Sequence, residues 1–293
     1  MRLLSFRDGP AERLGVALED RVLPATALLA GGPATLSDLL AGEEGVLSAL
    51  REAAGGATDR IRGEGLALAG LRLLAPVPRP GKVVAIGLNY HAHAAEQKVE
   101  PPTEPLVFAK FTTSVIGPGE AITWDLALTD QVDYEAELAV VIGRRARHVT
   151  TDEALDHVLG YTCANDVSAR DLQFGDRQWV RGKSLDTFCP LGPVLVTTDD
   201  IPDPQTLAIA CDVSGQRLQS GSTADMIFSV AAIVAHCARA FTLEPGDVIL
   251  TGTPAGVGVW RDPPRFLHDG DEVTVEIKGI GRLANPCREL GAT

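Results

Sequence analysis

The sequence predicts a β-dominated α+β protein with a small N-terminal domain over residues 1–75 and a larger domain over residues 76–293. Two observations support this. Residues 75–81 (APVPRPG) place three prolines within five residues, which neither a helix nor a central strand accommodates. After this boundary, short apolar segments separated by Gly, Pro and Asp outnumber helical patterns, which is typical of α+β folds.

The N-terminal region is rich in Ala, Leu and Gly and shows no cluster of reactive side chains. Leu36–Leu50 has the spacing of a short helical stretch. Leu66–Leu74 predicts a strand or a short edge element. We expect a small α+β unit that carries no chemistry of its own.

The larger domain contains a succession of predicted strands and a few predicted helices. The strands are Val83–Ile86, Leu106–Phe111, Val132–Ile142, Val158–Asn165, Val194–Thr197, Leu207–Val213, Val248–Leu250 and Glu272–Ile277. The helices are His91–Gln97, Thr151–His157, a segment around Ser168–Phe174, and Met226–Phe241. The last has its apolar side chains at helical spacing, and it is too short to span a bilayer.

The charge and cysteine content limit the partners and the compartment. A formal net charge of −13 argues against a nucleic-acid-binding surface. The five cysteines are far apart and odd in number, which fits neither a disulfide framework nor a zinc ribbon. The charged, Pro- and Gly-containing N-terminus does not have the pattern of a signal peptide. We expect a cytoplasmic protein with buried thiols and no membrane partner.

Two glutamates mark the segment VDYEAELAVVIG at residues 132–143. Side chains alternate faces along a strand, so Glu135 and Glu137 lie on the same face, together with Ala139 and Val141. Like charges on a half-buried strand repel, and solvent, basic partners or a cation must offset the repulsion. The pattern leaves two interpretations open, a solvated strand face and a metal site.

Asp166 favours the metal site. It follows the predicted strand Val158–Asn165, at the point where a helix begins. Its alternative role is to cap that helix, which Ser168 could also do. Three carboxylates without Cys or His suit a hard cation, Mg²⁺ first, with Mn²⁺ and Ca²⁺ as alternatives.

His93 and Glu96 are spaced i, i+3 on a predicted helix, so their side chains can touch. A carboxylate that orients an imidazole supports a general base. The alternative is an ordinary surface pair on an exposed helix.

Cations are concentrated between residues 170 and 184 of this acidic chain. Lys183 stands in a Gly-Lys-Ser context without the glycines of a phosphate-binding loop, so a nucleotide site is rejected. Arg170, Gln173 and Lys183 are candidates to line an anion pocket, with surface solvation as the alternative for Arg170.

The loop TGTPAGVG at residues 251–258 offers the N–H of Gly252 and the hydroxyl of Thr253 to a substrate carboxylate. Its alternative is a plain turn.

Taken together, these motifs resemble the fumarylacetoacetate hydrolase superfamily. They occur in register as G-x-N-Y-x-x-H-x-x-E at 87–96, D-Y-E-x-E-L at 133–138, G-Y-x-x-x-N-D-V-S-A-R-D at 160–171, R-G-K-S-x-D-T-F-x-P-x-G-P at 181–193 and L-x-P-G-D-x-I-x-T-G-T-P-x-G-V-G at 243–258. The resemblance spans about residues 80–287. It is most similar to short bacterial members, of the acylpyruvase and 2-hydroxyhepta-2,4-diene-1,7-dioate isomerase type.

The resemblance implies a mixed β-sandwich or roll as the catalytic domain, residues 76–293, in a homodimer. It implies metal ligation by Glu135, Glu137 and Asp166, and a base, His93, oriented by Glu96. It also implies substrate contacts from Lys183, Gln173 and Thr253, and less directly from Arg170.

The expected substrate is a small 2-oxo acid, whose carboxylate and ketone oxygens a metal can bind together. The reaction that we expect first is metal-dependent hydrolysis of a C–C bond in an acylpyruvate-like acid. Decarboxylation of an oxaloacetate-like acid and isomerisation of a hydroxy-dienoate, in aromatic or sugar-acid catabolism, are the alternatives. A non-catalytic metal-binding role would be expected to lack His93 and Lys183, and both are present.

Overall fold

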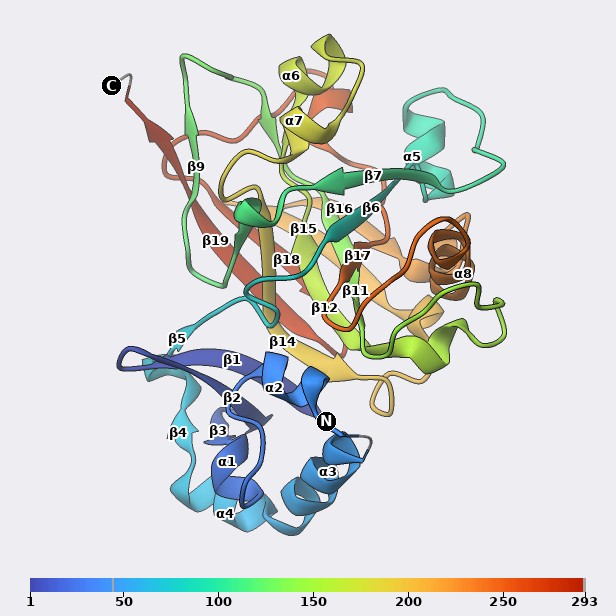
Figure 1. The fold of residues 1–293 in the computed structure, drawn as a ribbon. Helices are drawn as coiled ribbons and strands as arrows, with labels where there is room; N and C mark the ends of the chain where they lie inside the picture. Colours follow the sequence, from blue (N-terminus) through green and yellow to red (C-terminus); the bar gives the residue numbers. More distant parts are fainter. Residues whose placement is uncertain (44, 292–293) are drawn as a thin grey trace.

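The computed structural model describes residues 1–43 and 45–291 and confirms the β-dominated α+β class (Figure 1). Its largest sheet has twelve strands. Along its main path the order is β4 (Leu66–Ala67), β3 (Arg21–Pro24), β2 (Ala11–Leu18), β1 (Arg2–Asp8), β14 (Cys189–Thr197), β12 (Val158–Asn165), β11 (Ala136–Ile142), β17 (Val248–Leu250), β6 (Val83–Gly87) and β7 (Leu106–Lys110). β5 (Arg72–Leu73) pairs with β1, and β8 (Val115–Ile116) pairs with β14.

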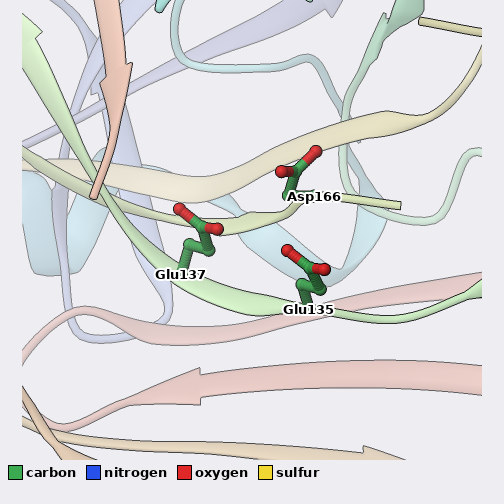
Figure 2. A group of neighbouring side chains, drawn as sticks. All are labelled: Glu135, Glu137 and Asp166. Atoms are coloured by element: carbon green, nitrogen blue, oxygen red, sulfur yellow. The ribbon is translucent and has the colours of Figure 1, made fainter. Parts of the chain in front are cut away.

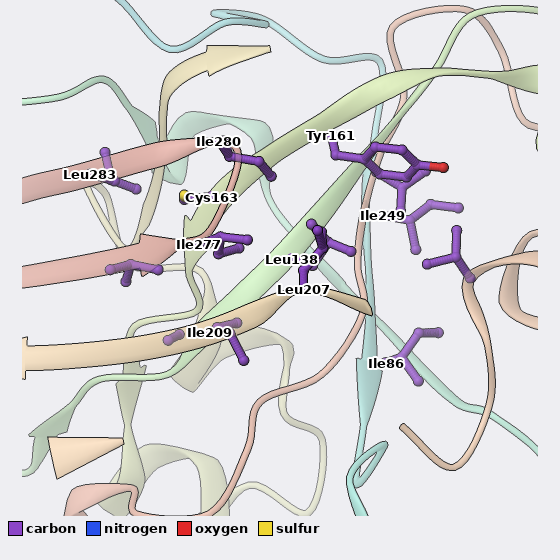
Figure 3. Close-up of a cluster of buried hydrophobic side chains, with 14 of the residues drawn as sticks. Ile86, Leu138, Tyr161, Cys163, Leu207, Ile209, Ile249, Ile277, Ile280 and Leu283 are labelled. Atoms are coloured by element: carbon purple, nitrogen blue, oxygen red, sulfur yellow. The ribbon is translucent and has the colours of Figure 1, made fainter. Parts of the chain in front are cut away.

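A second sheet of five strands packs against the centre of the first. Its order is β16 (Gln216–Ser222), β15 (Ala208–Val213), β18 (Glu272–Ile277), β19 (Gly281–Leu290) and β9 (Ile122–Asp125). Figure 3 shows the apolar layer between the sheets, where Leu138 and Cys163 from the large sheet lie near Ile209, Ile277 and Leu283 from the small one. This layer is the main core.

The opposite face of the large sheet is covered by N-terminal helices. These are α1 (Ala25–Leu28), α2 (Leu36–Ala41), α3 (Val46–Gly56) and α4 (Thr58–Glu64). Leu36 and Leu50 from these helices share a buried cluster with Ala139 and Val141 of β11. Since both of its faces are covered, every residue of β11 is buried. The predicted helical stretch Leu36–Leu50 thus contains all of α2 and the first part of α3, and its residue 44 lies outside the described residues.

The large sheet continues across the predicted boundary at residues 75–81. β1 pairs antiparallel with β14 through Arg2 with Val196 and Leu3 with Leu195. The sequence reading did not identify β1, β2 and β3. The division into domains 1–75 and 76–293, whose last two residues also lie outside the described part, stays a prediction.

The remaining helices lie in the second part of the chain. They are α5 (His91–Glu96), α6 (Arg170–Gly175), α7 (Val180–Lys183) and α8 (Val230–Ala240), with a 3-10 turn at Gly258–Trp260. None of the helices within residues 1–43 and 45–291 is long and apolar enough to cross a membrane.

The predicted strand Val132–Ile142 is divided into two parts. β10 (Val132–Asp133) pairs with β13 (Ser168–Ala169), and β11 begins at Ala136. Between them the N–H of Glu135 donates to the side-chain oxygen of Asn165 at 3.0 Å, not to a neighbouring strand. The break places Glu135 at the open end of β11, beside the end of β12.

Candidate active site

Three carboxylates meet where β11 and β12 lie side by side. Glu135 precedes β11, Glu137 is its second residue, and Asp166 directly follows β12. Figure 2 shows the three side chains around a common space, and one ligand oxygen from each lies within 4.8 Å of the others. Their exposed fractions are 6%, 1% and 0%, which excludes the solvated strand face.

The three carboxylates differ in electrostatic environment. Burial and the charges of Asp166 and Glu135 raise the pKa of Glu137 well above its ordinary value. Burial also opposes ionisation of Glu135, but Lys183 and Arg170 outweigh it and lower the pKa of Glu135 to about 2. A divalent cation among the three oxygens would offset the repulsion at Glu137. A buried all-carboxylate set fits a hard cation of this kind.

Asp166 is held by two buried ammonium groups. Lys183 Nζ donates to Asp166 Oδ2 at 2.7 Å and to Glu135 Oε2 at 2.9 Å. Lys110 Nζ donates to Asp166 Oδ1 at 2.6 Å and to the Val167 carbonyl at 3.2 Å. The Asp166 side chain therefore does not cap the following helix. Burial acts to lower the pKa of Lys183, but Asp166 and Glu135 outweigh it and raise it, so this ammonium is a fixed cation.

The sequence reading missed Lys110. The signal was a lysine at the end of an apolar strand, Leu-Val-Phe-Ala-Lys, where a charged side chain is buried only if it has a partner. Its partner is Asp166, which is 56 residues further along the chain.

Arg170 connects the three-carboxylate cluster to Gln173. Its Nε donates to Asp133 at 2.8 Å, and its Nη2 lies 2.8 Å from Asp133 and 2.7 Å from Glu135. Its Nη1 donates to Gln173 Oε1 at 2.9 Å. Because the amide oxygen of Gln173 is engaged in this way, its NH₂ group is left as the end that can donate to a ligand. Arg170 itself has its guanidinium committed to protein partners.

Asp133 is a second residue that the sequence reading did not single out, although it begins the D-Y-E motif. Its buried carboxylate accepts from Arg170, from the N–H of Tyr134, and from the N–H groups of Gly258 and Val259 at 2.7 and 3.0 Å. It therefore ties α6, through Arg170, to the turn at Gly258–Trp260.

His93 and Glu96 form the predicted pair. His93 Nδ1 lies 2.6 Å from Glu96 Oε1, and His93 Nε2 lies 2.8 Å from the Gln97 amide nitrogen. The other Glu96 oxygen accepts from the N–H of Gly256 at 2.9 Å. This contact holds α5 against the loop at residues 251–258, which we call the glycine loop. His93 is buried, unlike the histidine of a surface helix pair.

The glycine loop contacts Glu137 and the first residue of β11. Gly252 donates its N–H to Glu137 Oε2 at 2.6 Å, and its φ of +98° favours glycine. The Thr253 hydroxyl donates to the Ala136 carbonyl at 2.9 Å and accepts from Gln219 at 2.8 Å. The Gly252 N–H is thus engaged by the protein. Thr253 lines the cavity, and substrate contacts by these two residues stay predictions.

One cavity is lined by several of these groups. It is bounded on its polar side by Glu135, Glu137, Lys183, His93 and Gln173. A wall of aromatic side chains, which we call the aromatic wall, completes it, formed by Phe108, Phe174, Trp179 and Trp260. An imidazole, carboxylates and a fixed ammonium in one cavity can together move a proton and stabilise a negative charge.

The chain is similar to proteins of one known family over most of its length. A family model described as fumarylacetoacetate (FAA) hydrolase, C-terminal, matches residues 82–288. The chain is 43% identical over 292 residues to a Xenopus laevis protein named oxaloacetate tautomerase, mitochondrial, covering 98% of this chain and 90% of that protein. This chain is an enzyme of the fumarylacetoacetate hydrolase family, as its motifs predicted.

Solved structures agree with the fold over the whole chain. A fumarylacetoacetate hydrolase from Exiguobacterium antarcticum superposes with a TM-score of 0.85 at 38% identity, covering 99% of this chain and 100% of that one. A maleylpyruvate hydrolase from Sphingobium, in complex with manganese(II) and pyruvate, has a TM-score of 0.81 at 32% identity and covers 99% of both chains.

Proposed function

We propose that this protein is a divalent-metal-dependent tautomerase that interconverts the enol and keto forms of a 2-oxo acid, with oxaloacetate as the first substrate to test. The observation that carries the proposal is one cavity lined by Glu135, Glu137 and His93. Asp166 completes the carboxylate cluster beside this cavity, and Glu96 contacts His93. The relative named oxaloacetate tautomerase, similar over nearly the whole chain, supports the choice of substrate.

Glu135, Glu137 and Asp166 would hold the cation, Mg²⁺ or Mn²⁺, which supplies positive charge for an enolate when bound. The manganese in the maleylpyruvate hydrolase supports a divalent ion, and the identity of the ion in this chain is part of the proposal.

His93 would move the proton. Tautomerisation removes one proton from the enol oxygen and adds one to C3, so the substrate and product have the same composition. Glu96 orients the imidazole and favours the neutral tautomer that carries its hydrogen at Nδ1, which makes Nε2 the atom that exchanges the proton. Gln97 lies at Nε2 and must release it when substrate binds.

Lys183 and Gln173 would hold the substrate. The ammonium of Lys183 stays charged beside the carboxylates and stabilises negative charge on the enolate oxygen. The Gln173 amide, oriented by Arg170, offers its NH₂ group to the substrate carboxylate.

The test is the rate of enol-to-keto conversion of oxaloacetate, followed by ultraviolet absorbance with protein freed of metal by EDTA. Restoration of Mn²⁺ or Mg²⁺ should accelerate conversion well above the rate with the metal ion alone. No acceleration over that blank would contradict the proposal.

Hydrolysis of a C–C bond, the reaction expected first from the sequence, is the second candidate. The similarity to the maleylpyruvate hydrolase favours it, because the same His93–Glu96 pair could activate a water molecule. Release of pyruvate from acylpyruvates in the same preparation tests it. Loss of CO₂ from oxaloacetate tests the decarboxylase alternative.

A further inference from the structure

The aromatic wall concentrates a scarce residue type at one place. The chain has 8 Phe and 3 Trp among 293 residues, yet four of these eleven rings line the cavity. Phe108 and Trp179 meet edge to face with centroids 5.3 Å apart. Phe174 and Trp260 lie 6.2 Å apart with their planes at 54°.

Phe174 and Trp260 are the open part of this wall. Their exposed fractions are 53% and 44%, although both rings line the cavity. They come from α6 and from the turn at Gly258–Trp260, and Asp133 holds both segments through Arg170, Gly258 and Val259. Exposed apolar side chains at the rim of a polar cavity are typical of a ligand-binding surface.

The described residues that line the cavity include no permanent cation that lacks a carboxylate partner. Among the described residues that line it, Arg170 and Lys183 carry the permanent positive charges, and both are bound to carboxylates. The faces of aromatic rings carry negative partial charge, so they attract planar apolar groups and disfavour a carboxylate. The ring faces therefore do not stabilise a second carboxylate on the substrate, whereas they can pack against an apolar substituent.

We infer that the aromatic wall is a subsite for a planar, uncharged, unsaturated substituent on C3 of the 2-oxo acid, such as an aryl ring. The inference rests on the proposed function for the position of the 2-oxo acid group beside the carboxylates. It extends the substrates from oxaloacetate to 3-aryl-2-oxo acids, whose tautomerisation exchanges the same two protons.

The first experiment measures binding, independently of turnover. Phenylpyruvate and pyruvate, which share the 2-oxo acid group and differ by the ring, are titrated calorimetrically into the Mn²⁺-loaded protein. We expect phenylpyruvate to bind about tenfold more tightly than pyruvate, and Trp260→Ala or Phe174→Ala to remove most of that difference. Both side chains are half exposed, so these variants should fold. Equal affinity for the two acids in the unmodified protein would overturn the inference.

Matched variants separate the subsite from general effects of mutation. Phe111→Ala removes an aromatic side chain that is 59% exposed and does not line the cavity, and it should leave the tenfold preference intact. Phe174→Arg places a cation at the rim and should shift the preference from phenylpyruvate towards oxaloacetate. A preference that is unchanged in both Trp260→Ala and Phe174→Arg would also overturn the inference.

Turnover distinguishes this inference from the proposed function. If phenylpyruvate binds through the wall but neither phenylpyruvate nor oxaloacetate is tautomerised, the subsite stands and the tautomerase proposal fails. If oxaloacetate is tautomerised while phenylpyruvate binds no better than pyruvate, the tautomerase proposal stands and the subsite fails.

Discussion

Lys110 and Asp166 form an ion pair in which both side chains are fully buried, with Nζ and Oδ1 2.6 Å apart. Because Lys183 occupies the other oxygen, two positive charges surround one carboxylate of the three-carboxylate cluster. Such an arrangement neutralises Asp166 and at the same time opposes the approach of a further cation.

Lys110→Met should therefore change stability and metal affinity in opposite directions. Removing one partner of a buried pair should lower the free energy of unfolding by about 3 kcal/mol, since Lys183 still contacts Asp166. Loss of the positive charge should tighten Mn²⁺ binding. Urea unfolding and Mn²⁺ titration measure the two effects, with the exposed Lys278→Met as control. Weakening of both would show that Lys110 acts only as a structural support.

Glu137 should make the metal-free protein less stable as pH rises. Its pKa is raised in the folded state, so the stability it contributes is fully present below its ordinary value of 4.5. That contribution is lost as pH rises through the higher, folded-state pKa. Glu137→Gln should abolish this loss, and so should Mn²⁺. Thermal unfolding in EDTA measures the effect, from below pH 4.5 to above the folded-state pKa of Glu137. The exposed Glu272→Gln is the control. A parallel pH profile for Glu137→Gln and the unmodified protein would contradict the assignment.

His93→Ala should separate proton transfer from metal binding. We expect kcat to fall by roughly 10²–10⁴, which is typical for loss of a positioned base. Mn²⁺ affinity should stay the same, because His93 is outside the three-carboxylate cluster. Glu96→Gln should cause a smaller loss, and His91→Ala, on the exposed side of the same helix, should have little effect. Full activity in His93→Ala would remove it as the base.

Asp133→Asn should disturb the site, although Asp133 itself does not contact the substrate. The amide would turn a donor towards Arg170 or the Gly258 and Val259 N–H groups, and the buried guanidinium would lose its main partner. We expect the free energy of unfolding to fall by about 3–5 kcal/mol. Chemical unfolding measures this, and Asp130→Asn, an exposed neighbour, is the control. A loss below about 1 kcal/mol would mean that the pair is dispensable.

The sequence was most informative where chemistry repeats at short range. The i, i+2 spacing of Glu135 and Glu137 and the i, i+3 spacing of His93 and Glu96 are local, and the structure brings each pair together. Partners distant in the chain were not predictable in this way. Lys110 reaches Asp166 across 56 residues, and no periodic pattern encodes that contact.

The N-terminal strands were missed for a related reason. Phe6, Val16 and Val22 are buried, but charged residues such as Arg7, Glu12 and Arg13 interrupt the alternation that identifies a strand. Of the three strands, β1 pairs with β14, nearly 200 residues away, and such tertiary pairing overrides local propensity.

The pairing of β1 with β14 also has a consequence for how the chain is made. Arg2 pairs with Val196, so the two are 194 positions apart (196 minus 2). During synthesis, the part of β1 that pairs with β14 stays unpaired until β14 has left the ribosome. Contacts of such long range form slowly, and unpaired edges invite association with other chains. We therefore expect the nascent chain to need protection by chaperones.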